Sequence, residues 1–281
     1  HTDPAIGWYR TDAPTASHLA VLITAVIAVS MDLIGYIFDV VTAFLTGEKL
    51  QRELYTRAPK GGLPTVGSCP VVKPFGVLKI LKGAYGLTEA PRLWYLKAKN
   101  LLEGIGAVEL KIARAVFVFR EKNKTGTSGL IAVLSLYVDD GLLFGDPADP
   151  RFQRVKVKVD STFNIKHWKS LGSEPIKYLG MQWQTFVEDN AVSLCIHMDE
   201  YIDNLKDAGL KVKGDSDRPL AAEELAQYRS LLAKARWPVN GIAPELAYGA
   251  SALAQLNTNK AGEDKVFHAK ELDGLVQRLK M

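Results

Sequence analysis

Apolar residues follow two patterns along the chain. Short apolar runs that are rich in β-branched and aromatic residues and bounded by Gly, Pro or polar turns predict strands. These runs cover residues 33–47, 115–121, 129–138, 141–145, 176–187 and 191–198. Apolar residues at helical spacing predict helices over residues 19–31, 89–106 and 146–165, and a mostly helical region from residue 198 onward. The pattern predicts an α+β fold with two regions, residues 1–197 and 198–281.

The most apolar stretch of the sequence covers residues 19–31. Pro14, with Thr15 or Ser17 as a cap, predicts that a helix begins just before it. The stretch is apolar on nearly every side, which predicts a buried helix. It is shorter than the roughly 20 residues that cross a bilayer and is followed by Asp32, so no membrane partner is expected.

Composition narrows the class of protein. The chain has 281 residues, 47% hydrophobic and 23% charged, as expected of one large or two linked globular domains. Its net charge of +4 is compatible with an anionic partner.

Cys69 and Cys195 lie far apart with no partner at ligand spacing, so neither a disulfide scaffold nor a structural zinc site is expected. With no signal peptide in the sequence we expect an intracellular protein, and the opening His1 indicates a fragment.

Two adjacent acids, Asp139 and Asp140, stand between the apolar runs at 129–138 and 141–145. We predict that the two runs form a hairpin with both acids at its tip, where the alternation of strand faces is interrupted. Two carboxylates in an apolar setting repel each other and lose hydration, a cost that a divalent cation offsets. Taken alone, such a pair is also ordinary turn chemistry.

A third acid, Asp39, ends another apolar run at the point where the chain turns. If the two strand ends are neighbours in one sheet, Asp39, Asp139 and Asp140 form a cluster of three carboxylates. Such a cluster suits Mg²⁺, with Mn²⁺ as an alternative, because these ions prefer oxygen ligands. The same ligands would also serve an unrelated magnesium-dependent nuclease or phosphatase.

Several motifs carry a family resemblance. They are "FDVVTAFLTGE" (38–48), "ELYTRAP" (53–59), "LKGAYGLTEAPRLWY" (81–95), "YVDD" (137–140), "YLGMQW" (178–183) and residues 228–255. The residues of these motifs and their order along the chain resemble those of the reverse transcriptases of copia-type retrotransposons. The sequence therefore looks like a fragment of a Pol polyprotein of that family. The resemblance covers nearly the whole chain, and these motifs in this order are together far more specific than any one of them.

The resemblance implies a right-hand polymerase fold. Residues 1–197 would form the palm with partial fingers and a primer-grip hairpin, and residues 198–281 a helical thumb or connection region. The implied activity is RNA-directed DNA synthesis. Asp39 and Asp139 would hold two Mg²⁺ ions, the Val40 carbonyl would add a ligand, and Asp140 would assist while a primer 3′-hydroxyl attacks the α-phosphate of a deoxynucleotide.

The resemblance also implies substrate contacts. Phe44 matches the residue whose ring lies under the nucleotide sugar, although a core Phe is an equally good reading of that position. The implied nucleotide-binding residues are Phe44, Tyr85, Gly86, Glu89 and Pro91. The implied primer and template contacts are Arg92, Lys99, Tyr137, Tyr178, Leu179, Gly180, Met181 and Trp183. For the last five of these, ordinary strand packing is the alternative.

Two stretches, residues 79–99 and 151–169, combine Lys and Arg with aromatic residues, as nucleic-acid-binding surfaces do. The alternative is a pair of amphipathic helices with a solvated basic face and aromatic residues in the core.

The chain departs from the family pattern in three places. Thr88 and Glu89 stand where most relatives have Lys-Gln, and a carboxylate there would repel phosphate. Ala243 replaces an Arg whose role we expect to be structural. The fingers segment that supplies basic residues for the triphosphate is expected to precede the sequence. From these departures we expect weak or absent polymerase activity in this fragment. They also leave open the alternative that the chain is a decayed or repurposed element copy, which binds nucleic acid without polymerizing.

The family also implies partners and location. The partners would be an RNA or DNA template with its primer, deoxynucleoside triphosphates, and other Pol segments such as integrase and ribonuclease H. The location would be the cytoplasm or a virus-like particle, with the nucleus as an alternative.

Overall fold

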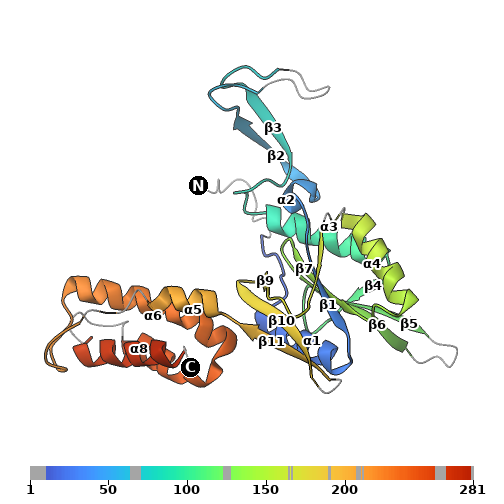
Figure 1. Cartoon of the computed structure of the whole chain (residues 1–281). Coiled ribbons are helices and arrows are strands. Elements are labelled where there is room, and N and C mark those ends of the chain that lie inside the picture. The colour runs from blue at the N-terminus through green and yellow to red at the C-terminus, as the bar shows by residue number, and fades with distance from the viewer. Residues whose placement is uncertain are drawn as a thin grey trace. The chain divides into compact units, whose positions relative to one another are not determined.

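The computed structural model describes residues 11–63, 71–122, 128–163, 165, 167–188, 191–206, 210, 212–256 and 264–279 (Figure 1). The chain divides into two compact units: His1–Leu171 with Val187–Val192, and Gly172–Phe186 with Ser193–Met281. Across the described ranges, no helix is both long enough and apolar enough to cross a bilayer. Residues 64–70, which include Cys69, lie outside the described residues, and so do residues 123–127 between the apolar runs at 115–121 and 129–138.

An antiparallel sheet forms the centre of the first unit. Its strand order is β4-β5-β6-β7-β1-β8. The strands are β1 (Ile34–Asp39), β4 (Ala107–Glu109), β5 (Val116–Lys122), β6 (Ser128–Tyr137), β7 (Asp140–Gly145) and β8 (Trp168–Ser170). The hairpin predicted around residues 130–145 is confirmed as β6 and β7, and β1 pairs with β7 although about a hundred residues separate them in the sequence.

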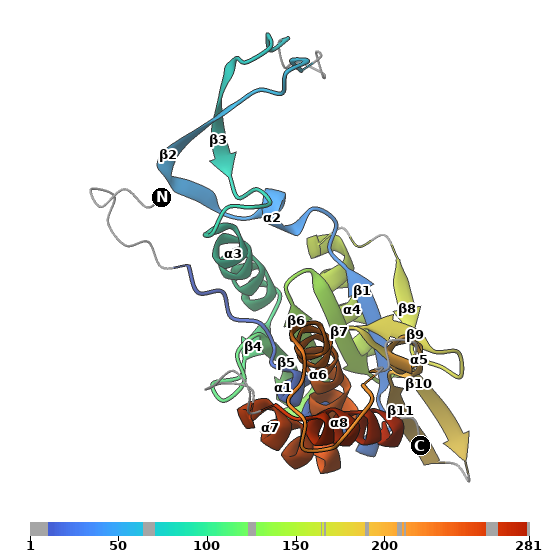
Figure 2. The same cartoon turned by 90° about the vertical axis from the view of Figure 1, so that its left-hand side faces the viewer.

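Helices cover both faces of this sheet. They are α1 (His18–Ser30), α3 (Ala90–Gly104) and α4 (Pro150–Phe163). Tyr36 contacts Phe152 of α4, whereas Tyr137 contacts His18 of α1. Tyr36 of β1 and Leu134 of β6 both pair with Leu143 of β7, so their side chains point to the same face of the sheet. Tyr137 comes three residues after Leu134 and therefore points to the opposite face. Helices α1 and α4 therefore cover opposite faces of the sheet, and α3 packs beside α4 (Figure 2).

Helix α1 begins as predicted and is less buried than predicted. The Ser17 hydroxyl accepts a hydrogen bond from the Ala20 N–H (3.1 Å), which makes Ser17 the cap. The small residues Val21, Ala25 and Ala28 face the sheet and are buried. Larger side chains on the outer face are at least half exposed: Leu19, Ile23, Val26 and Ile27. The expectation of a fully buried helix was wrong because a single sheet covers only one side of it.

A second hairpin, β2 (Lys49–Arg57) with β3 (Val77–Lys82), extends from the sheet region after the short helix α2 (Ala43–Thr46). The turn predicted near Thr42 is confirmed, since Thr42 takes a left-handed backbone conformation (φ 57°) between β1 and α2. The hairpin itself escaped the sequence pattern, because charged residues interrupt the apolar positions of both strands and few of their side chains are buried.

The second unit contains a small sheet and the helices that follow it. The sheet has the order β11-β10-β9, from β9 (Ile176–Tyr178), β10 (Met181–Glu188) and β11 (Ala191–His197). The helices are α5 (Asp199–Lys206), α6 (Ala222–Ile242), the 3₁₀ turn Pro244–Leu246, α7 (Ala247–Leu256) and α8 (Val266–Arg278). Tyr228, Leu231, Val239, Leu272 and Leu275 lie in their shared core. Ala243, where the family pattern has a cation, is buried at the end of α6.

The α+β class and the helical C-terminal region are confirmed. The palm and thumb layout and the boundary between residues 197 and 198 stay predictions. The strands at 176–178 and 181–186 group with the helical unit, whereas the sequence pattern assigned them to the first region.

Candidate active site

The three predicted acids meet at one end of β1, β6 and β7. Asp39, the last residue of β1, lies directly opposite Asp140, the first residue of β7. The Val40 N–H donates a hydrogen bond to the Asp139 carbonyl (2.9 Å), which continues the pairing into the turn. Residues opposite each other in an antiparallel pair point to the same face, with Cβ atoms about 5 Å apart. The backbone therefore brings Asp39 and Asp140 together and holds Asp139 beside them.

The hairpin turn is tighter than expected. Tyr137 pairs with Asp140, so only Val138 and Asp139 form the turn. Asp139 lies at the tip as predicted, but Asp140 already belongs to β7. Val138 has φ 58°, a left-handed conformation that is strained for a β-branched residue.

Electrostatic repulsion marks these carboxylates as a cluster. Burial, followed by the charges of Asp139 and Asp39, raises the pKa of Asp140 from 3.8 to about 6. Partial desolvation and the Asp139 charge also raise the pKa of Asp39. In the described part of the chain, no Lys or Arg forms an ion pair with any of the three acids. The excess negative charge is of the kind that a bound cation would neutralise.

The donor set fits Mg²⁺ in chemistry, since carboxylates supply hard oxygen ligands and all three are carried at the same end of two neighbouring strands. In their present positions the side chains of Asp39, Asp139 and Asp140 do not form a group that could hold a metal ion. The rest of the described residues contain no such group of His, Cys, Asp or Glu either. Because the backbone register already brings the Asp39 and Asp140 Cβ atoms together, rotation of the side chains is the change that a shared ion requires.

Gly141 supports the cluster from the opposite face of the sheet. It lies opposite Phe38, and a Cβ atom on Gly141 would stand 2.1 Å from Phe38 Cζ. The Phe38 ring in turn contacts Trp168 of β8 (4.7 Å between centroids). Only glycine leaves room for this ring beside the acids. Sequence reasoning missed this role, which becomes visible once the register of β1 and β7 is known.

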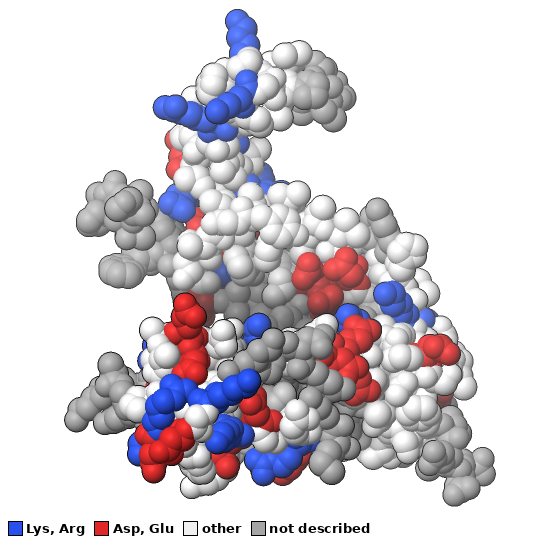
Figure 3. Space-filling view, turned by 60° about the vertical axis from the view of Figure 1, so that its left-hand side comes forward, with Lys and Arg blue, Asp and Glu red and all other residues white. Residues whose placement is uncertain are grey.

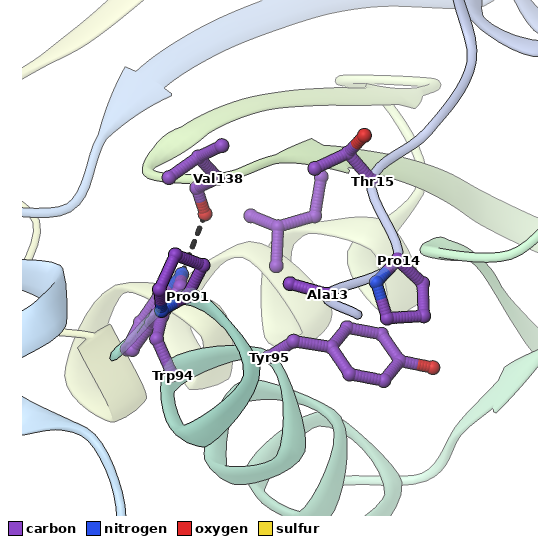
Figure 4. Close-up of a pocket in the computed structure, with 8 residues that line it drawn as sticks. Ala13, Pro14, Thr15, Pro91, Trp94, Tyr95 and Val138 are labelled. Atoms are coloured by element: carbon purple, nitrogen blue, oxygen red, sulfur yellow. Dashed lines mark hydrogen bonds between the residues drawn. The ribbon is translucent and has the colours of Figure 1, made fainter. Parts of the chain in front are cut away.

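Trp94 of α3 supports the turn directly. Its indole N–H donates a 2.6 Å hydrogen bond to the Val138 carbonyl (Figure 4). The side chain is 2% exposed and packs edge-on against Phe163 of α4. Beside it, residues 13–15 and α3 enclose a crevice of about 10 Å³, room for one water molecule at most and for no larger ligand. The sequence pattern placed Trp94 within the predicted helix at 89–106 and gave no sign of its contact with the turn.

The predicted nucleotide-binding residues lie close together around the start of α3. Phe44 of α2 and Tyr85 stack edge to face, with centroids 5.1 Å apart. Phe44 is only partly buried, and the Tyr85 ring that it contacts is 69% exposed. Phe44 therefore lies at the surface of the protein and not in its core. Gly86 (φ 93°) follows at an open position, and Pro91 opens the first turn of α3. Their contacts with a nucleotide stay predictions.

Glu89 is neutralised by a partner that the sequence did not reveal. Arg52 of β2 donates Nε to Glu89 Oε1 (2.7 Å) and Nη2 to Oε2 (3.1 Å). These hydrogen bonds hold the pKa of the buried Glu89 carboxyl below its ordinary value. Thr88 donates a further hydrogen bond to Oε2 (3.2 Å). The expected repulsion of phosphate by Glu89 is therefore countered by the adjacent guanidinium.

The two predicted template contacts on α3 have partners within the protein. Arg92 donates to the Asp12 carbonyl (2.9 Å) and lies 3.5 Å from its carboxylate. Lys99 is paired with the buried Glu109 (2.8 Å) and lies near Glu103 (3.7 Å). These contacts give both residues a structural role, and contact with nucleic acid stays a prediction.

The aromatic residues of the two basic stretches mostly face inward. Trp94, Tyr95, Phe152 and Phe163 are buried, so the core reading holds for them and they offer no surface for stacking bases. Lys166 lies outside the described residues. An exposed group of cations occurs instead at the outer end of the β2–β3 hairpin, at the top of Figure 3, where Arg57, Lys60 and Lys73 are exposed.

The segment predicted as the primer grip forms a hairpin with a tight turn between β9 and β10. Leu179 (φ 50°) and Gly180 (φ 75°) form the turn. Tyr178, Met181 and Trp183 are buried, as the strand-packing alternative expected. Leu179 is half-buried and Gly180 is exposed, and their contact with a primer stays a prediction.

Comparison with known proteins decides the family. A family described as "Reverse transcriptase (RNA-dependent DNA polymerase)" matches residues 3–218, well over half of the chain. The chain belongs to this reverse transcriptase family. It is 32% identical over 142 residues to the retrovirus-related Pol polyprotein from transposon TNT 1-94 of Nicotiana tabacum, which is 50% of this chain and 10% of that protein. It is 32% identical over 162 residues to the corresponding polyprotein from transposon RE1 of Arabidopsis thaliana, which is 55% of this chain and 10% of that protein.

The resemblance to copia-type Pol polyproteins is thereby confirmed at the level of homology. The chain spans about a tenth of the length of these relatives. Within the reverse transcriptase family, the matched region includes all three acids, Phe44, the β2–β3 hairpin and the β9–β10 turn.

Proposed function

We propose that this chain is an RNA-directed DNA polymerase of copia type that transfers nucleotides from dNTPs to a primer 3′-hydroxyl with two Mg²⁺ ions. The observation that carries the proposal is the position of Asp39 opposite Asp140, with Asp139 joined to the same strand end by the Val40 N–H. Membership of the reverse transcriptase family supports it.

In this mechanism Asp39 and Asp139 would hold the metal ions, the Val40 carbonyl would add a ligand, and Asp140 would assist beside them. Magnesium bound there would supply positive charge for the attacking and leaving oxygens. Mn²⁺ would take the same ligands. The chain's own contribution is geometric: the β1–β7 register sets the spacing of the carboxylates before substrate arrives.

The substrates follow from the same site. A dNTP would lie against Phe44 and Tyr85, with Gly86, Glu89 and Pro91 bordering it. An RNA or DNA template with its primer would contact Tyr137, Arg92 and Lys99, and the turn at Leu179 and Gly180 would approach the primer end. In this reading residues 1–197 are the palm with partial fingers and residues 198–281 the thumb or connection region, within a larger Pol polyprotein.

Primer extension on an RNA template, with Mg²⁺ and four dNTPs, tests the proposal. Asp139→Asn should abolish extension, because it removes a metal ligand from the turn. Asp32→Asn is the matched control: Asp32 is exposed, lies in a turn at φ 57°, and Asn tolerates that conformation. Extension that survives Asp139→Asn would overturn the proposed mechanism.

The alternative of a decayed copy is tested with the same protein. It predicts that the wild-type chain binds a primer–template duplex, measured by fluorescence anisotropy, and does not extend it in Mg²⁺ or Mn²⁺. Extension by the wild-type chain would exclude this alternative.

A further inference from the structure

We propose that Trp94 is a positioning residue that sets the location of Asp139 through the Val138 carbonyl; the inference rests on the proposed function for its catalytic consequence. The hydrogen bond from the Trp94 indole to Val138 is the shortest described contact between α3 and the turn that carries the acids. It joins a helix to the one residue that separates Tyr137 of β6 from Asp139.

The turn needs a support of this kind. Val138 is β-branched and has φ 58°, a conformation that persists only where the surrounding structure holds it. The carboxylates of Asp139 and Asp140 repel each other and add a second force that favours opening of the turn. A second contact at the turn is the hydrogen bond from the Val40 N–H to the Asp139 carbonyl. Trp94 and Val40 therefore hold the two consecutive carbonyls of the turn from two different elements of the fold.

Trp94 is suited to hold a fixed position. It is 2% exposed, its ring packs against Phe163, and Pro91 lies in the first turn of α3, three residues before it. The Val138 carbonyl accepts its hydrogen bond from the Trp94 side chain, which lies 44 residues earlier in the sequence. A displacement of the turn by a fraction of an ångström would move Asp139 relative to Asp39, and misplacement of about 1 Å is enough to slow an enzyme roughly 100-fold.

The test combines two substitutions. Trp94→Phe removes the N–H donor and keeps a buried ring, and Val138→Gly removes the backbone strain, since glycine adopts positive φ readily. Trp94→Phe should lower kcat for primer extension roughly 10- to 100-fold and raise the Mg²⁺ concentration for half-maximal rate, with little change in the KM for dNTP. In the Val138→Gly background the same change should lower kcat by less than about 3-fold. Equal losses in both backgrounds would mean that Trp94 acts through packing alone and would overturn the proposal.

Phe163→Leu is the matched packing control, because it removes the ring that Trp94 packs against and leaves the hydrogen bond to Val138 in place. It should lower kcat and alter the Mg²⁺ dependence by much less than Trp94→Phe does, because the N–H donor is kept and the indole stays buried. A loss equal to that of Trp94→Phe would contradict the positioning role.

Amide hydrogen exchange of Val40 provides a readout that does not depend on polymerase activity. Trp94→Phe should accelerate exchange at Val40 at least about 10-fold, because the turn that accepts its hydrogen bond becomes mobile. If exchange accelerates and the wild-type chain proves inactive, the proposed function fails and the support of the turn by Trp94 stands. If exchange does not change, the positioning role fails whatever the activity.

Discussion

Two tight hairpins of this chain, β6–β7 and β9–β10, share their design and differ in what they support. Each has a two-residue turn, Val138–Asp139 in one and Leu179–Gly180 in the other, and each turn begins with a non-glycine residue at positive φ. In each, a tryptophan indole donates a hydrogen bond to a backbone carbonyl at the turn. Trp183 bonds the Tyr178 carbonyl (3.1 Å) from the same hairpin, whereas Trp94 bonds Val138 from a separate helix.

The difference follows from the side chains that the turns carry. The β9–β10 turn is flanked by buried Tyr178 and Met181, which stabilise it by packing. The β6–β7 turn contains Asp139 and is followed directly by Asp140, and the repulsion between these carboxylates opposes the turn. Its indole hydrogen bond comes from the separate helix α3, whereas that of the β9–β10 turn comes from within its own hairpin.

The glycines of the two hairpins offer the largest contrast. Gly141→Ala would drive a methyl group into the Phe38 ring, which already stands 2.1 Å from the position of a Cβ atom, so we expect a loss of about 2–3 kcal/mol in the free energy of unfolding. Gly180 has φ 75°, with the nearest side-chain atom of Trp237 3.4 Å from its Cβ position, so Gly180→Ala should cost only about 1 kcal/mol, from backbone strain. Urea denaturation of both variants measures the difference, and a larger loss for Gly180→Ala would contradict this account of the packing.

The charge of the β6–β7 turn gives a pH-dependent effect. Asp140 has its pKa raised to about 6 in the folded chain, so its ionisation destabilises the fold. This penalty is absent below the unfolded pKa of 3.8, grows between that pH and about 6, and is complete above it. After allowance for solvent screening, Asp140→Asn should raise the free energy of unfolding by about 1–2 kcal/mol at pH 8 in EDTA.

The same substitution should have little effect at pH 3.5, where the carboxyl is protonated in the folded state and mostly protonated in the unfolded state. Added Mg²⁺ should reduce the gain at pH 8, because the ion would stabilise the ionised wild type. Asp32→Asn is the control for loss of a negative charge elsewhere. A gain that is equal at both pH values would show that the repulsion among the acids is not its cause.

A carboxylate with a partner should respond in the opposite direction. Glu89 is paired with Arg52 and its pKa is lowered from 4.5, so its ionised form stabilises the fold. That contribution is present above pH 4.5 and is lost as the pH falls through the lowered folded pKa. Glu89→Gln should therefore cost about 1 kcal/mol at pH 7.

A double-mutant cycle with Arg52→Gln measures the pair itself. The two losses should be less than additive, because each substitution removes the same interaction. Additive losses, or a gain for Glu89→Gln like that for Asp140→Asn, would show that Arg52 does not neutralise this carboxylate.

Local patterns in the sequence identified much of the fold and the three acids. The apolar runs around Asp39 and Asp139 predicted strands that end at acids, and Ser17 was among the expected caps. These features depend on residues that are near neighbours in sequence, where period and turn chemistry are informative. The β2–β3 hairpin was missed because its strands are built from charged residues with little burial.

The supports of the site could not be predicted, because each depends on a contact between distant segments. Gly141 needs the register that places it opposite Phe38, Trp94 needs the approach of α3 to the turn, and the partner of Glu89 comes from 37 residues away. The basic and aromatic stretches were ambiguous for the same reason, since sequence spacing does not show which face of a helix is covered.

Metal binding to the acid cluster tests the central claim most directly. Mn²⁺ binding can be followed by electron paramagnetic resonance, with the chain bound to a template, a primer that ends in a 3′-deoxynucleotide and the matching dNTP. We predict that the wild type and Asp32→Asn bind Mn²⁺, that Asp39→Asn and Asp139→Asn lose this binding, and that Mg²⁺ competes for it. Equal Mn²⁺ binding by the wild type and Asp139→Asn would contradict the assignment of these acids to a metal site.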